Sequence, residues 1–362
     1  MKKRVRIIDI AKKAGVSKGT VDRVIHKRGN VAPAVKKRIL AVMEELEYRP
    51  NAIASALAYN RTWKVAALLP DPADDVFWIQ PKKGIQKALN FTADYGMTVD
   101  FFHFVDADTE RFQAHCSEIL AGQYDAVLVA PVFYNQAHEF LNQCATIGLK
   151  YFLINTFLER ADASFQTYVG QDSYQSGVLA AKLLDFGIEH KDAVMVLHLE
   201  KGVYNAKHLL AKEQGFQNYF IDHSTRNIQI IKTNFEEPTD TIAFRKFMNY
   251  QLKSYPNLRG IFVTTSKIYH LVNTLSELQA QRIKLVGFDL IEPNLEHLRA
   301  EKIDFLINQN PVKQGYLGII NIFEHLVRKE EVQPLQHLPL DVVMQENLSY
   351  YLEADKQLHL MI

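Results

Sequence analysis

The chain has 362 residues, of which 48% are hydrophobic and 23% are charged, a composition typical of a globular protein with two or three folding units. Residues 1–61 carry 15 Lys and Arg against 5 Asp and Glu, a balance of +10, whereas the remainder carries 27 against 36, a balance of −9. This asymmetry predicts that the basic head, residues 1–61, binds a polyanion and that the acidic body, residues 62–362, does not. A solvated basic tail is the alternative, and the regular patterning of the head disfavours it.

Cysteine content and hydropathy exclude several classes of protein. Cys116 and Cys144 are the two cysteines, so the sequence offers no disulfide framework and no cysteine metal cluster, and we expect neither a metal nor another cofactor. The first twenty residues are charged throughout, and no apolar run approaches the length of a membrane span. We therefore expect a cytoplasmic protein with no membrane partner.

Residues 7–14 predict a short helix, because Ile7, Ile10, Ala11 and Ala14 fall on one helical face. Gly15 then ends the helix, since the position after a helix favours a residue that tolerates positive φ. Ser17 follows as an N-cap whose hydroxyl can accept from the N–H of Thr20, and a second helix runs from about Lys18 to His26. Two short helices joined by such a turn form a helix-turn-helix, whose second helix enters the major groove of DNA.

The second helix directs polar residues outward. Lys18 is placed for a guanine or a phosphate, Gly19 lets the backbone approach closely, and Arg23 can reach a base or a phosphate. A solvated surface position is the alternative for each. A third helix starts near Pro33, a favoured first-turn residue, and its basic side chains either position the head on phosphates or remain solvated.

A short hinge helix is expected after Pro50, with Asn51 as its cap. A helix of about eight residues is marginal by itself, so it needs a partner such as its copy in a dimer or DNA. Two heads on two half-sites predict a two-fold symmetric homodimer on double-stranded operator DNA, with a tetramer as the open alternative.

The run from Ile7 to Leu57 resembles the DNA-binding head of the LacI family almost end to end, in the words DIAKKAGVSKGTVDRVIH and ILAVMEELEYRPNAIASAL. In that family the paired hinge helices lie in the minor groove, and a leucine at the position of Leu57 wedges between base pairs; linker packing is the alternative. Asp22 and His26 stand where the family usually has Ser and Asn, which leaves the operator sequence open. The positions assigned to DNA are Ser17, Lys18, Gly19, Thr20, Arg23, His26, Asn51, Ala54 and Leu57.

From Trp63 onward, buried strands alternate with amphipathic helices, as in KVAALLPD followed by GIQKALNFTADYG. This alternation predicts parallel sheets with helices on both faces, in two halves that leave a cleft at the carboxyl ends of the strands. The body resembles the type I periplasmic-binding-protein fold of LacI regulators and sugar-binding proteins. The fold class is therefore an all-α helix-turn-helix head plus hinge helix, followed by an α/β two-lobed domain.

The predicted domains are 1–50 for the head, 51–61 for the hinge helix and linker, and 62–362 for the effector domain. The resemblance implies three crossings between lobes, which we expect near Phe157–Glu159, Gln309–Pro311 and Gln333–Leu340. The two lobes then comprise 62–157 plus 311–335, and 158–310 plus 336–362.

We predict the ligand residues by matching the ends of the predicted strands to the ligand-binding positions of the family that the body resembles. Phe77 and Trp78 match an aromatic pair that stacks on a sugar face, with core packing as the alternative. Lys212 lies where the family typically has a ligand-binding Arg, Asp289 matches an acceptor for sugar hydroxyls, and Gln309 matches a pocket glutamine. Thr265 and Ser266 replace a common Asn-Asp pair, so the sugar stays open. The full set of expected effector residues is Phe77, Trp78, Asn155, Asp172, His208, Lys212, Thr265, Ser266, Asp289 and Gln309.

No catalytic motif of a hydrolase, zinc protease, P-loop or dinucleotide enzyme is present in the sequence, so we expect no enzymatic activity. The body alone would permit a transport-type solute-binding protein, which the DNA-binding head disfavours. The sequence therefore predicts a transcription regulator, a repressor of the LacI type, whose operator affinity is controlled by a sugar or sugar derivative bound in the cleft. Whether that molecule releases DNA or promotes its binding stays open.

Overall fold

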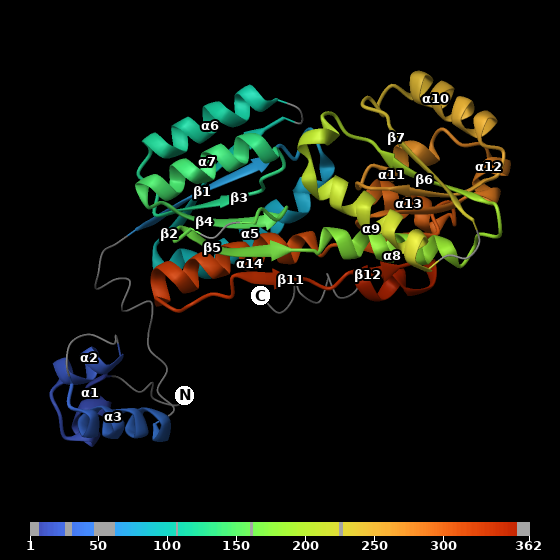
Figure 1. Ribbon diagram of the computed structural model, residues 1–362. Coiled ribbons are helices and arrows are strands. Elements are labelled where there is room, and N and C mark those ends of the chain that lie inside the picture. Colours follow the sequence, from blue (N-terminus) through green and yellow to red (C-terminus); the bar gives the residue numbers. More distant parts are fainter. Residues whose placement is uncertain are drawn as a thin grey trace. The chain divides into compact units, whose positions relative to one another are not determined.

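The computed structural model describes residues 7–25, 31–46, 62–105, 108–159, 162–223 and 227–352. The chain divides into two compact units, Met1–Arg61 and Thr62–Ile362. Figure 1 shows both with their elements labelled.

Three helices form the described part of the first unit: α1 (Ile7–Ala14), α2 (Lys18–Ile25) and α3 (Pro33–Glu45). Their apolar faces enclose one small core, and these three predicted helices are confirmed, whereas the predicted hinge helix at 51–61 lies outside the described residues. The core comprises Ile10, Ala11, Ala14, Val21, Val24, Ile39 and Val42. Gly15 has a φ of +63°, the left-handed conformation expected of the residue that ends α1. An ion pair of 2.6 Å between Lys13 Nζ and Glu45 Oε1 ties α1 to α3.

The described residues of the second unit form two six-stranded sheets. The first sheet contains β1 (Trp63–Pro70), β2 (Met97–Phe104), β3 (Ala126–Val129), β4 (Lys150–Asn155), β5 (Phe165–Gly170) and β11 (Leu335–His337). The second sheet contains β6 (Ala193–His198), β7 (Gln229–Asn234), β8 (Leu258–Val263), β9 (Lys284–Phe288), β10 (Phe305–Asn308) and β12 (Asp341–Val343).

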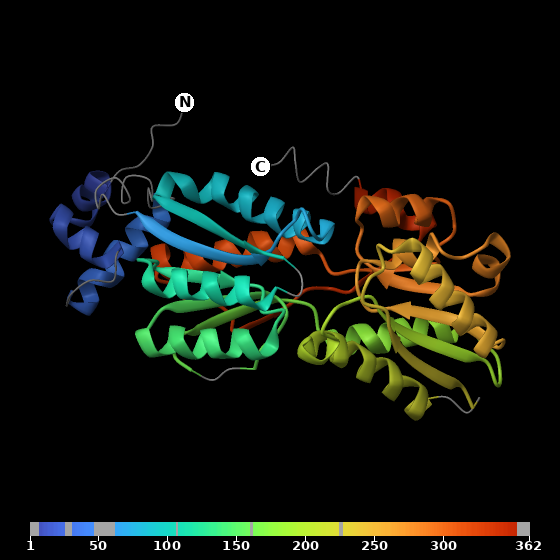
Figure 2. The ribbon, with the colours of Figure 1, turned by 90° about the horizontal axis from the view of Figure 1, so that it is seen from above.

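Helices cover both faces of each sheet, so the two lobes lie side by side as three-layered units (Figure 2). The helices of the first lobe are α5 (Ile79–Thr92), α6 (Thr109–Ala121), α7 (Tyr134–Ile147) and α14 (Pro311–Phe323). Those of the second lobe are α8 (Ser173–Asp185), α9 (Lys207–His223), α10 (Thr241–Ser254), α11 (Ile268–Val272), α12 (Glu277–Arg282) and α13 (Glu292–Arg299). Within the described residues, no helix combines the length and apolarity needed to cross a bilayer.

Both sheets have the same strand order. The order is β11-β5-β4-β3-β1-β2 in the first and β12-β10-β9-β8-β6-β7 in the second, parallel throughout except that β12 runs antiparallel to β10. In the first lobe β1 lies between β2 and β3, and in the second lobe β6 lies between β7 and β8. Such a reversal of strand order leaves a crevice at the carboxyl ends of the strands, where open α/β sheets bind ligands. The predicted doubly wound, two-lobed architecture is confirmed.

The predicted position of the first crossing, Phe157–Glu159, is wrong. The chain continues through β5, which pairs with both β4 and β11 in the first sheet, and it enters the second lobe only at Gln171 and Asp172. The strand was missed because Gln166 and Thr167 interrupt its apolar run. Residues 162–170 and 336–337 therefore belong to the first lobe.

The other two crossings fall within the predicted segments. Residues 309–310 connect β10 to α14, and residues 338–340 connect β11 to β12. The three crossings are thus short, and each joins an element of one sheet to an element of the other lobe.

Candidate functional site

The exposed end of α2 is the candidate nucleic-acid interface. Ser17 caps this helix, because its Oγ accepts from the N–H of Thr20 at 3.1 Å and lies 2.9 Å from Thr20 Oγ1. Lys18, Gly19 and Arg23 are exposed on the outer side of α2. A Cβ at Gly19 would meet only Ser17 Oγ, at 3.8 Å, so the backbone here is open to close approach.

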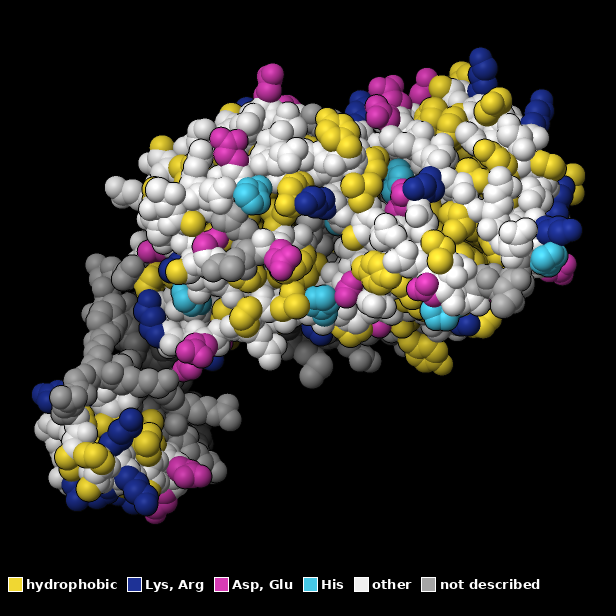
Figure 3. Space-filling view, in the orientation of Figure 1, with side chains coloured by type: hydrophobic (Ala, Val, Ile, Leu, Met, Phe, Trp, Pro, Cys, Tyr) yellow, Lys and Arg dark blue, Asp and Glu magenta, His cyan; other side chains and the backbone are white. Residues whose placement is uncertain are grey.

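The head presents positive charge on its described surface. Figure 3 shows several Lys and Arg side chains on the face of the first unit, with few acidic ones between them. Asp22 is half-buried on α2. The remaining predicted DNA positions, His26, Asn51, Ala54 and Leu57, lie outside the described residues.

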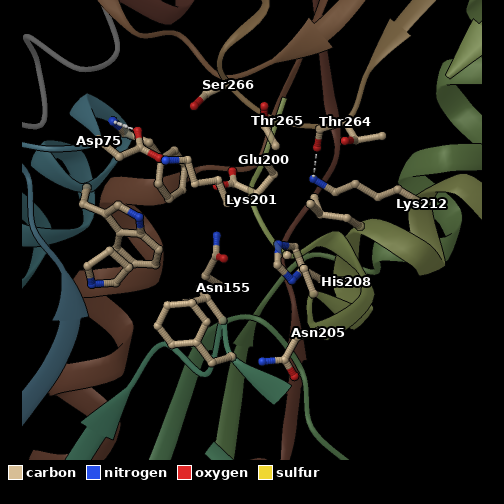
Figure 4. A pocket seen from close by; sticks show the side chains of 18 of the residues that line it. Asp75, Asn155, Glu200, Lys201, Asn205, His208, Lys212, Thr264, Thr265 and Ser266 are labelled. Atoms are coloured by element: carbon tan, nitrogen blue, oxygen red, sulfur yellow. Dashed lines mark hydrogen bonds between the residues drawn. The ribbon is translucent and has the colours of Figure 1, made fainter. Parts of the chain in front are cut away.

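A pocket lies between the two lobes of the second unit, at the carboxyl ends of β1, β3, β4, β6, β8 and β9 (Figure 4). Its lining combines aromatic, amide and charged side chains. The lining residues are Pro70, Asp75, Phe77, Trp78, Val132, Phe133, Asn155, Glu200, Lys201, Gly202, Asn205, Ala206, His208, Leu209, Lys212, Thr264, Thr265, Ser266, Asp289 and Gln309. Together they surround a hollow that opens to solvent.

Nine of the ten predicted effector residues line this pocket, and Asp172 does not. The Asp172 carboxylate caps α8, where Oδ1 accepts from the N–H of Gln175 at 2.9 Å, and Oδ2 lies 3.9 Å from His337 Nδ1. The structure does not bring Asp172 together with the other nine, because the side chain caps a helix at the first crossing.

The loops after β1 and β6 supply pocket residues that sequence reasoning missed. Asp75 stands in the loop after β1, while Glu200, Lys201 and Asn205 stand in the loop after β6. The available signal was their position directly after buried strands, since such loops meet at one edge of a parallel sheet.

Asp289 and Lys212 form the buried charged centre of the pocket. Lys212 Nζ donates to the carbonyl of Thr264 at 2.9 Å and lies 3.6 Å from the ring centroid of Phe288. Burial lowers the pKa of Lys212, an effect that the charge of Asp289 opposes. Burial likewise raises the pKa of Asp289, and hydrogen bonds from Gln309 to its carboxylate oppose this shift. Each group thus depends on its neighbours to stay charged.

The other pocket charges have partners within the protein. Glu200 Oε2 lies 3.0 Å from Lys267 Nζ, and Lys201 Nζ lies 3.3 Å from Glu237 Oε1. One Asp75 oxygen accepts from the N–H of Phe77 at 2.9 Å. The pocket therefore presents carboxylate and amide acceptors, while its cations are engaged.

The aromatic residues are held rigidly. Phe77 and Trp78 are both 5% exposed, and their rings meet edge to face with centroids 5.0 Å apart. Only small parts of these rings reach the pocket, because both side chains also pack in the apolar core of the first lobe.

Direct contacts join the lobes across the pocket. Asn205 Oδ1 accepts from the N–H of Asn135 at 3.0 Å, and Asn205 Nδ2 donates to Gln136 Oε1 at 2.9 Å. Nearby, Lys207 Nζ lies 3.6 Å from the ring centroid of Tyr134. Asn205 therefore lines the pocket and also bridges the lobes.

Backbone strain marks two pocket positions. Asn155 ends β4, the fourth strand of the first lobe, and Asp289 directly follows β9, the fourth strand of the second. Their φ values are +66° and +65°. Left-handed backbone at residues other than glycine is uncommon and concentrates at functional sites. The two lobes thus place an amide and a carboxylate at corresponding points.

Family comparisons match both units. Residues 65–330 match the periplasmic binding protein domain, and residues 6–51 match the head of the bacterial regulatory proteins of the lacI family. The sucrose operon repressor of Lactococcus lactis subsp. lactis is 24% identical over 305 residues, which cover 82% of this chain and 88% of the repressor. The catabolite control protein A of Priestia megaterium is 40% identical over 82 residues, which cover 23% of this chain and 24% of that protein.

Solved structures share the body. A structure described as a candidate LacI transcriptional regulator from Bacteroides fragilis has a TM-score of 0.74 and 25% identity, covering 80% of this chain and all of that one. A solute-binding protein of an ABC transporter from Agrobacterium vitis, bound to α-D-tagatopyranose, has a TM-score of 0.69 and 23% identity, covering 79% and 96%. The second likeness is one of fold.

Proposed function

Because the chain belongs to the periplasmic binding protein domain family and carries a lacI-family head, we propose that it is a sequence-specific DNA-binding regulator controlled by a small carbohydrate. The observation that carries the proposal is the presence, in one chain, of a capped helix-turn-helix and a two-lobed domain with a polar pocket. A regulator of this kind acts on the chromosome, which in bacteria lies in the cytoplasm. It functions as a homodimer, because two heads match two half-sites of an operator.

The proposed sugar is uncharged. Carboxylates such as Asp75 and Asp289 accept from hydroxyl groups, but they repel a phosphate. A phosphate would need free cations, and Lys212 is 3% exposed and already bound to a carbonyl. Neutral hydroxyls between carboxylates, amides and aromatic edges suit this lining.

DNA binding is tested on the full chain by selecting a binding sequence from random DNA and measuring affinity against salt. Replacing Lys18 with Ala should weaken specific binding by about 1–3 kcal/mol if the side chain contacts a base. Lys253→Ala, which removes an exposed lysine from α10, is the matched control and should change nothing. A wild-type protein that enriches no sequence and binds all DNA alike would contradict the regulator.

Sugar binding is tested by thermal shift with D-tagatose, D-arabinose, D-fucose and D-allose, the sugars held by solved structures of similar fold. A sugar at a hundred times its Kd should stabilise the protein by about 2.7 kcal/mol. D-allose 6-phosphate serves as the charged comparison and should give no shift. Stabilisation by the phosphorylated sugar alone would overturn the choice of a neutral ligand.

A further inference from the structure

Hydrogen bonds connect all three crossings between the lobes. Gln171 Nε2, at the first crossing, donates to Gln309 Oε1 at the second. Asn310 Nδ2 donates from the second crossing to the carbonyl of Pro339 at the third, at 3.2 Å. The N–H of Leu338 closes the ring by donating to the carbonyl of Gly170, beside the first crossing, at 2.7 Å. Rotation of one lobe against the other must therefore strain this ring.

The pocket carboxylate is attached to the same ring. Asp289 is fully buried, its Oδ1 accepts from the N–H of Gln309 at 3.1 Å, and its Oδ2 accepts from Gln309 Nε2. A carboxylate can only accept, so it fixes the orientation of the Gln309 amide, with Nε2 toward Asp289 and Oε1 toward Gln171. Gln171 must then present its own Nε2. The carboxylate of Asp289 thus determines how the side-chain amides of both Gln309 and Gln171 are oriented.

A second connection reaches the other lobe. Tyr168 is fully buried, and its hydroxyl lies 2.8 Å from the carbonyl of Gln171 and 3.1 Å from the carbonyl of Asn155. Asn155 and Asp289 are the two pocket residues with left-handed backbone. Gln171 therefore lies between the strained pocket residue of one lobe and that of the other.

Gln171 itself is outside the pocket lining and is 3% exposed. It and Gln309 occupy corresponding places, because each directly follows the fifth strand of its lobe, β5 or β10. Gln171 lies behind Gln309 and does not reach the pocket, yet any change in the angle between the lobes must alter the geometry of this amide pair.

We infer that Gln171 is a positioning residue that couples the pocket to the hinge: through Gln309 it transmits the hydrogen-bonding state of Asp289 to the crossings and so sets the angle between the lobes. A hydroxyl that donates to Asp289 shares the oxygens that accept from Gln309, which weakens those hydrogen bonds and loosens the ring. The consequence for DNA rests on the proposed function, whereas the coupling within the second unit does not.

The test measures the distance between lobes in the full chain by double electron–electron resonance. Spin labels are attached at Ile147→Cys on the first lobe and Tyr250→Cys on the second, positions that are 59% and 68% exposed. Cys116 and Cys144 are buried, and burial raises the pKa of the Cys116 thiol, so both resist labelling.

Gln171→Met keeps the volume of the side chain but removes the donor to Gln309. It should change the ratio of interlobe states by about 5- to 150-fold, the usual size of such couplings, seen as a broadened or shifted distance distribution. Gln336→Met is the matched control, since Gln336 exchanges 3.3 Å hydrogen bonds with Asn321 inside the first lobe. The control should keep the wild-type distribution.

A wild-type distribution in Gln171→Met would overturn the inference, as would an equal change in both variants. If Gln171→Met does not fold, Gln171→Asn, which keeps the amide but falls short of Gln309, is measured in its place with the same expectation. These measurements need neither DNA nor sugar, so a failure of the coupling is distinguished from a failure of the proposed function. If the operator is found, Gln171→Met should also reduce the change in operator affinity caused by D-allose or D-tagatose.

Discussion

The packing of α8 on α9 leads to a prediction that joins stability to the pocket. A Cβ added to Gly177 of α8 would lie 1.9 Å from the carbonyl oxygen of Lys212 on α9. Ordinary contact begins near 3.4 Å, so the carbonyl would have to withdraw by about 1.5 Å. A Cβ added to Gly215 of α9 would likewise lie 2.0 Å from the carbonyl oxygen of Tyr174 on α8. The two helices approach this closely because neither has a side chain at the crossing.

Replacing Gly177 with Ala should therefore force the helices apart. Overpacking of this kind costs about 1–3 kcal/mol, and the upper end applies because both colliding groups are backbone. Alanine returns about 0.8–1.0 kcal/mol through its greater helix propensity, which leaves a net loss of about 2 kcal/mol. Each kcal/mol lowers the Tm of a unit as long as Thr62–Ile362 by about 1.5 °C. Because Lys212 must move with its carbonyl, sugar binding should weaken as well.

The assay is calorimetric unfolding of the full chain, together with the thermal shift produced by D-allose or D-tagatose. Gly187→Ala is the matched control, since its added Cβ would meet only the flexible Lys284 side chain, at 3.0 Å. The control should stay within about 0.5 kcal/mol of wild type. A Gly177→Ala variant that unfolds at the wild-type temperature or above would show that the helices do not touch as closely as inferred.

Three further predictions concern single side chains. Ser17→Ala removes the cap of α2 and should cost the head about 1 kcal/mol, read from helicity during urea unfolding, while an unchanged transition would contradict the capping role. Asp289→Asn keeps a residue that tolerates left-handed backbone but loses the carboxylate, so it should abolish the thermal shift by neutral sugars; a retained shift would exclude Asp289 as a ligand. The hydrogen bond from His198 and the ion pair with Lys232 hold the pKa of Glu213 below its usual 4.5, so their stabilisation is present above pH 4.5 and is lost as the pH falls below it. Glu213→Gln should flatten this acid limb of the stability curve, and an unaltered limb would assign it to other carboxylates.

The head and the general architecture follow from sequence because their signals are local. The turn at Gly15 and the cap at Ser17 act within a few residues, and both appear in the structure. The alternation of apolar strands and amphipathic helices predicts two parallel sheets for the same reason, since each element carries its own period.

The errors arise where tertiary context decides. β5 is an interior strand, yet Gln166 and Thr167 make its sequence too polar to be recognised as one. Thr167 is fully buried, and its hydroxyl is satisfied there by donating to the carbonyl of Gln333, far along the chain, at 2.5 Å. Asp172 follows a strand end like a ligand residue, but the chain turns there into α8 and uses the carboxylate as its cap. Glu200 could have been predicted from its place just after β6, whereas Asn205 stands farther along the loop and only the folded path brings it to the pocket.

The correspondence between the lobes explains why one carboxylate has such influence. Asn155 and Asp289 have the same left-handed backbone at corresponding strand ends, and Gln171 and Gln309 correspond one strand later. If both pocket residues were amides, the Gln171–Gln309 pair could point in either direction with similar energy, because an amide both donates and accepts. A carboxylate in only one lobe removes that ambiguity and orients the pair. The two lobes therefore place Gln171 and Gln309 at corresponding points of the hinge, and the carboxylate of Asp289 orients the hydrogen bond between them, which a hydroxyl in the pocket can change.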